Sequence, residues 1–134
     1  MKNGKRMASD RKADDHFEKI TAAIGSLPEA IVIWDEHDRL VYWNDTYREL
    51  CPVVADMMKV GAYFPDIVWE SIVRKQFIIQ ESPEEWFSRR LEFHHRCEGY
   101  MEQQLVTGQW VRMSERRTPW GGVISFRSDL TPLK

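Results

Sequence analysis

The pattern of apolar and polar positions changes its period three times along the chain. Apolar side chains recur at helical spacing over residues 14–28, then gather in short β-branched and aromatic runs at 30–35 and 40–44. Helical spacing returns in the middle of the chain, and from residue 100 onward apolar and polar residues alternate. This order predicts a helix, two strands, several helices and a final group of strands.

The first predicted helix carries one apolar stripe. Gly25 and Pro28 end the helical pattern, and the polar residues 1–13 before it predict a flexible leader. A single stripe needs a cover, either the rest of the domain or a second copy of the chain. We therefore expect a dimer face on this helix, made of Phe17, Ile20, Ile24 and Leu27.

The later elements have clear boundaries. Ser82-Pro83-Glu84-Glu85 is a capping sequence and begins a helix that ends near Gly99. Three strands follow over 100–107, 110–118 and 123–129, and Gly108-Gln109 forms the tight turn between the first two. Strands grouped at both ends of a helical middle predict an α+β fold with one antiparallel sheet.

Composition and charge exclude several classes of protein. A chain of 134 residues, 43% hydrophobic and 30% charged, is the size and type of one folded domain. A formal net charge of −2 argues against bulk electrostatic binding of nucleic acid. No apolar run approaches the roughly 18 residues of a membrane span, and no secretory signal is present. Cys51 and Cys97 are too few for a disulfide framework, so we expect reduced thiols, a cytoplasmic location and no membrane partner.

The ordered set of short motifs resembles the PAS domains that are common in bacterial sensor kinases of two-component systems and in cyclic-dinucleotide enzymes. The resemblance covers about residues 16–134. The motifs that carry it are Leu27-Pro28-Glu29-Ala30-Ile31, Ile33-Trp34-Asp35, Leu40-Val41-Tyr42-Trp43-Asn44, the run 110–118, Gly121-Gly122-Val123 and Asp129-Leu130-Thr131.

The resemblance implies a five-stranded antiparallel sheet with helices on one face, a core over residues 29–134, and a ligand pocket between the helices and the sheet. It also implies a non-enzymatic sensory module. Such a module forms homodimers, binds a small molecule or a partner, and passes its signal through helices at its ends. The output domain, such as a histidine kinase or a cyclic-dinucleotide enzyme, is expected to be absent from this chain.

The candidate ligand site centres on Arg127. The resemblance places this position inside the pocket, and a buried guanidinium needs a partner. Two interpretations stay open: an internal ion pair with Glu115, or a ligand carboxylate or phosphate held by two hydrogen bonds. Trp34 is the candidate for stacking on a flat ligand. The predicted ligand-binding residues are Arg127, Ser125, Val123, Val32, Trp34 and Glu115. Asp129 and Thr131, which end the sheet, are the predicted signal-transmission residues.

Cofactor motifs are not evident. Cys51-Pro52 does not match the reactive-cysteine motif of flavin photosensors, and the adjacent His94 and His95 cannot both face one metal. We expect His94 to be half-buried, and we predict no metal ligand and no catalytic residue. Because neither cofactor motif is present, the sequence does not identify a cofactor.

Two alternatives remain. The first is a ligand-free structural dimerisation module whose own large side chains fill the pocket. The second is a small α+β-barrel enzyme with Asp35 or His94 as its base, against which the early strands at 30–44 argue.

Overall fold

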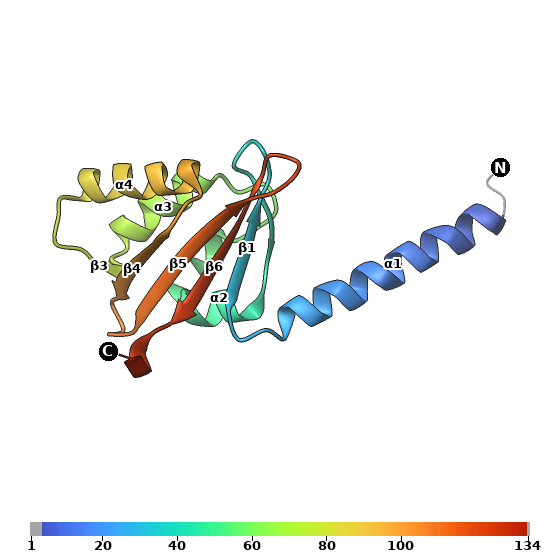
Figure 1. Cartoon of the computed structure of the whole chain (residues 1–134), viewed down its shortest axis with the longest axis horizontal. Coiled ribbons are helices and arrows are strands. Elements are labelled where there is room, and N and C mark those ends of the chain that lie inside the picture. Colours follow the sequence, from blue (N-terminus) through green and yellow to red (C-terminus); the bar gives the residue numbers. More distant parts are fainter. Residues whose placement is uncertain (1–3, 134) are drawn as a thin grey trace.

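A computed structural model describes residues 4–133 (Figure 1). Its centre is one antiparallel sheet of six strands in the order β2-β1-β6-β5-β4-β3. The strands are β1 (Ala30–Trp34), β2 (Leu40–Trp43), β3 (Phe77–Ile78), β4 (Tyr100–Leu105), β5 (Trp110–Arg117) and β6 (Val123–Asp129). The helices are α1 (Gly4–Gly25), α2 (Asp45–Leu50), α3 (Phe64–Val73) and α4 (Pro83–Arg96), with short 3-10 turns at Pro52–Met57 and Thr131–Leu133.

The early strands join the late ones in a single layer. Strand β1 pairs with β6 from Ala30↔Arg127 to Trp34↔Val123, which confirms the predicted α+β sheet. The predicted strand count was one too low. Phe77 and Ile78 form the added strand β3 by pairing with the end of β4, and two residues are too few to show an alternating pattern.

Helix α1 begins earlier than the sequence predicted. It starts at Gly4 instead of residue 14, so residues 4–13 are helical, whereas residues 1–3 of the expected leader lie outside the described part. Residues 5–13 contain neither Gly nor Pro and include several good helix formers. Figure 1 shows α1 projecting away from the sheet and from the other helices.

The core lies between the sheet and α2, α3 and α4. Along β6, Val123, Ser125 and Arg127 are buried on the helix-facing side, while the residues between them are partly exposed. Helix α4 begins as the sequence predicted, because the Ser82 hydroxyl accepts a hydrogen bond from the Glu85 backbone N–H at 3.2 Å. Its buried face places charged side chains directly over the sheet.

Candidate functional site

The six predicted ligand-binding residues lie together on the helix-facing side of β1, β5 and β6. All six are buried, from 1% exposed for Val123 and Glu115 to 8% for Arg127. Their contacts separate them into two groups. Glu115 and Ser125 belong to a polar network under α4, whereas Arg127 lies farther along β6 beside α2.

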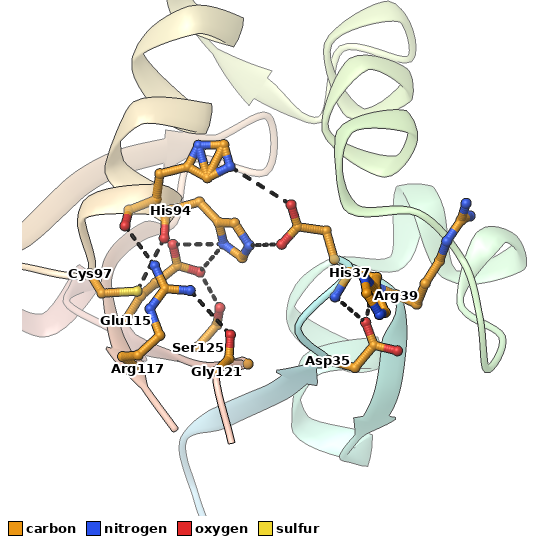
Figure 2. A network of polar contacts seen from close by, with 12 residues as sticks. Asp35, His37, Arg39, His94, Cys97, Glu115, Arg117, Gly121 and Ser125 are labelled. Atoms are coloured by element: carbon orange, nitrogen blue, oxygen red, sulfur yellow. Dashed lines mark hydrogen bonds and ion pairs between the residues drawn. The ribbon is translucent and has the colours of Figure 1, made fainter. Parts of the chain in front are cut away.

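Glu115 is held by three side chains. Arg90 donates two hydrogen bonds to its carboxylate, at 2.9 and 3.2 Å, and His94 Nδ1 lies 3.2 Å from both oxygens. Figure 2 shows Glu115 between His94 and Ser125, whose hydroxyl donates to the carboxylate. Burial disfavours the charged form, but the charge of Arg90 and the contacts with His94 outweigh it and lower the pKa of Glu115 below its usual range.

His94 extends the network to the turn between β1 and β2. Its Nε2 lies 2.9 Å from Asp38 Oδ1 (Figure 2), and its ring stacks on Phe64 with centroids 3.7 Å apart. The expected half-buried position was wrong. His94 is 1% exposed, because α4 packs this face directly on the sheet. The rings and the ion network occupy the interior where the resemblance implied a ligand pocket, and Trp34 packs edge-on against Phe64 instead of facing an opening.

Arg127 does not form the suggested ion pair with Glu115. Among the described residues, its one side-chain hydrogen bond runs from Nη1 to Cys51 Sγ at 3.1 Å, and its buried Nε has no partner. Its guanidinium lies over the Tyr47 ring, 5.1 Å from the centroid, and 6.0 Å from that of Phe77. The ion pair does not form because Arg90, on α4, already binds the Glu115 carboxylate.

The side chains that contact Arg127 carry no negative charge near neutral pH. Burial raises the pKa of the Cys51 thiol, although Arg127 opposes the rise, and burial raises the pKa of Tyr47 to about 12. Near neutral pH both groups are therefore uncharged. The sulfur and the two rings offer polarisable surface to the guanidinium but no carboxylate.

A surface hollow of about 200 Å³ opens beside Arg127. It is lined by Pro28, Thr46, Glu49, Leu50, Gln109, Arg127 and Asp129. Thus one predicted ligand-binding residue and one predicted signal-transmission residue share a hollow. The other five members of the predicted ligand set do not line it.

Asp129 and Thr131 fasten the end of the sheet. Asp129 accepts hydrogen bonds from the Thr131 backbone N–H at 2.9 Å and from Gln109 Nε2 at 3.2 Å. The bonds from Thr131 are the main reason that the pKa of Asp129 is lowered. Thr131 in turn accepts from the Trp110 backbone N–H at 3.0 Å. These bonds fix the direction in which the chain leaves β6.

Asn44 is a residue whose role the sequence did not reveal. Its Oδ1 accepts from the backbone N–H groups of Ile31 and Tyr47, and its Nδ2 donates to the carbonyls of Ile24 and Glu29. One buried side chain thereby joins the end of α1, strand β1 and the start of α2. An asparagine between a strand and a helix suggests an N-cap, but its other three partners are distant in sequence.

The predicted dimer face remains uncovered in the single chain, and its last member was placed wrongly on the helix, because α1 ends at Gly25 and Leu27 lies in the link that follows. Phe17 is 66% exposed, Ile20 58% and Leu27 44%, while Ile24 is half-buried. The end of α1 is attached to the core by Asn44 and by the Tyr42 hydroxyl, which donates to the Thr21 carbonyl at 3.3 Å. A groove of about 620 Å³ runs between this end of α1 and β2.

None of the helices over residues 4–133 is both long and apolar enough to cross a membrane. Within the same range, no group of three or more His, Cys, Asp or Glu side chains is arranged to hold a metal ion.

Comparison with known proteins gives one curated relative and several solved structures. The chain is 28% identical over 116 residues to the "Non-motile and phage-resistance protein" of Caulobacter vibrioides. That match covers 87% of this chain but 12% of the relative, so the chain spans about an eighth of that protein's length.

The structural matches are distant in sequence. The PAS domain of an HTR-like protein from Haloarcula marismortui has a TM-score of 0.56 at 13% identity, with 92% of this chain and 98% of that one covered. The phage VqmA–DPO complex has a TM-score of 0.55 at 17% identity, covering 90% and 55%. The PAS domain of Bordetella pertussis BvgS has 0.50 at 18%, covering 87% and 88%. At such identities these likenesses show the fold.

The family comparison covers most of the chain. Residues 24–134 match the family model described as "PAS fold", a range that takes in the whole sheet, the helices that cover it and the end of α1. The chain therefore belongs to the PAS-fold family of sensory and signalling modules.

Proposed function

We propose that this PAS domain is a non-enzymatic signalling module that works as a homodimer, with α1 as the dimer contact. The observation that carries the proposal is the exposed apolar stripe on a helix that projects from the domain. Isolated helices are marginally stable in water and are normally stabilised by burying an apolar face. The stripe therefore calls for a partner surface.

The spacing of the stripe fits a second copy of α1. Phe17, Ile20 and Ile24 on α1 are separated by three and four residues, which is the spacing of core positions in a coiled coil, and Leu27 follows two residues beyond the end of the helix. Two identical helices related by a two-fold axis would each cover the other's stripe. The groove between α1 and β2 is a separate surface, which the proposed contact between the two stripes would not need to fill.

A path for the signal runs from α1 to the end of the sheet. Asn44 bonds to the Ile24 carbonyl of α1 and to the Glu29 carbonyl before β1. The Ser128 hydroxyl at the end of β6 donates to the Glu29 carboxylate at 3.3 Å. A change in the packing of two α1 helices would therefore reach Asp129 and the chain beyond it. In a longer protein, this exit would lead to an output domain such as a histidine kinase or a cyclic-dinucleotide enzyme.

A ligand-free structural association module is the second candidate. It is favoured by the dense interior, in which Trp34, His94 and Glu115 contact neighbouring side chains. Both candidates require the α1 contact. They differ in whether a ligand alters the module.

The test is the mass of the chain in solution. The double variant Ile20→Asp/Ile24→Asp places four carboxylates in the proposed two-fold contact and should give a monomer by analytical ultracentrifugation, whereas the unaltered chain sediments as a dimer. Arg11→Asp/Ala22→Asp is the matched control, because at roughly 100° per residue these positions lie opposite the stripe. A monomeric unaltered chain, or a double variant that still dimerises, would contradict the proposal.

A further inference from the structure

The hollow beside Arg127 lies where the two ends of the core meet. Pro28 reaches it from the link between α1 and β1, and Arg127 and Asp129 reach it from the end of β6. Helix α2 forms the opposite wall with Thr46, Glu49 and Leu50. At about 200 Å³, the hollow is smaller than the roughly 300–1,000 Å³ pockets of drug-sized ligands, so it suits a small molecule.

One wall carries the positive charge of Arg127, which forms no ion pair with another described residue. Arg127 is 8% exposed, its Nε is unpaired, and its hydrogen-bond partner Cys51 is a neutral thiol. Glu115, the counter-charge that the sequence suggested, is paired with Arg90 instead. A buried guanidinium of this kind favours a carboxylate or phosphate, to which it can donate two parallel hydrogen bonds.

Two carboxylates of the lining carry the opposite charge, one on α2 and one beside Arg127 at the end of β6. Glu49 and Asp129 both line the hollow and are exposed. With Arg127 they give the lining a formal charge of −1, so a simple anion is attracted by the guanidinium and repelled by the two carboxylates. A simple cation meets the reverse conflict at Arg127. A small molecule with both charges avoids both conflicts.

We propose that this hollow binds a free α-amino acid, with its carboxylate on Arg127 and its ammonium group facing Glu49 and Asp129. Such a ligand bridges α2 and the end of β6. Binding itself does not depend on dimerisation, but its effect on signalling rests on the function proposed above.

The test is calorimetric titration of the full chain with each of the twenty proteinogenic L-amino acids. For any amino acid that binds, two analogues are then titrated, one lacking the α-ammonium and one lacking the α-carboxylate. We expect at least one amino acid to bind and both of its analogues to bind at least about tenfold more weakly, since each loses a charge-assisted hydrogen bond.

Two variants assign the groups. Arg127→Met and Glu49→Gln should each weaken binding at least about tenfold, while the exposed controls Arg116→Met and Glu84→Gln, outside the hollow, should not. Arg127 packs over Tyr47, so Arg127→Met can fail to fold. Glu49 is exposed, and Glu49→Gln keeps the test decisive in that case.

The proposal is overturned if no amino acid binds at millimolar concentration, or if binding is unchanged in Glu49→Gln. It is also overturned if the analogue without the ammonium group binds as tightly as the amino acid. Repeating the titration on Ile20→Asp/Ile24→Asp separates the two proposals. Amino-acid binding by the monomeric variant supports the site independently of the dimer, whereas a variant that still dimerises contradicts only the proposed function.

Discussion

Replacing Arg90 by Met tests whether the network under α4 is held together by charge. The Arg90 and Glu115 side chains are 2% and 0% exposed and share two hydrogen bonds. Met fills similar space without charge, so Glu115 would stay buried with His94 and Ser125 alone. Breaking a buried pair in this way costs about 3–5 kcal/mol, a large part of the roughly 5–15 kcal/mol that stabilises a domain.

The assay is urea unfolding followed by tryptophan fluorescence. The midpoint should fall with an unchanged slope, which assigns the effect to stability and not to a different unfolded state. The control is Arg112→Met, which removes an exposed pair with Glu102 at 3.2 Å and should cost under about 1 kcal/mol. If Arg90→Met costs no more than Arg112→Met, the reasoning about a buried charge network is refuted.

The same variant has a pH signature with a defined sign. The folded-state pKa of Glu115 lies below its ordinary value of 4.5. Its contribution to stability is therefore present above pH 4.5 and is lost as the pH falls through the folded-state pKa. Without Arg90 the folded-state pKa rises, so acid unfolding should begin at a higher pH in Arg90→Met. An identical acid midpoint in both proteins would contradict the role assigned to Arg90.

Two other predictions concern the ends of the core. Asn44→Ala should lower the free energy of unfolding by about 2–4 kcal/mol, because the N–H groups of Ile31 and Tyr47 lose their buried acceptor; a urea midpoint unchanged within error would contradict this. Asp129→Asn should be less stable than the unaltered chain at neutral pH, since the lowered pKa of Asp129 reflects bonds from Thr131 to the charged form. That stability difference should shrink as the pH falls below about 4, and a constant difference from pH 7 to pH 3 would rule out a charge-dependent role.

Local patterns predicted the parts of the fold that depend on neighbouring residues. The alternation in β4, β5 and β6 and the capping sequence at Ser82 were sufficient to place those elements. The start of α1 was missed, because a polar segment that forms a projecting helix has no apolar stripe to mark it. The strand β3 was missed because it depends on pairing with β4.

The candidate site was less predictable because its partners are far apart in sequence. An ion pair between Glu115 and Arg127 on the neighbouring strand was one of the two interpretations left open, but Arg90, twenty-five residues before Glu115, forms the pair instead. An arginine within a polar helix is normally a solvated residue, and nothing local shows that α4 turns it toward the sheet. The family resemblance correctly placed Arg127 on the inner face, but the hollow beside it depends on how α2 and the turn at Gln109 pack.

The pairing of the first core strand with the last has a mechanical consequence. Ala30 begins β1, and its partner Arg127 stands near the end of β6, so the segments entering and leaving the core are attached at the same end of an antiparallel pair. A pull that separates these two segments would load the hydrogen bonds between β1 and β6 one after another, as a zipper opens, instead of loading all of them at once in shear. Tension applied between α1 and the segment after Asp129 would therefore open the sheet from this end at low force.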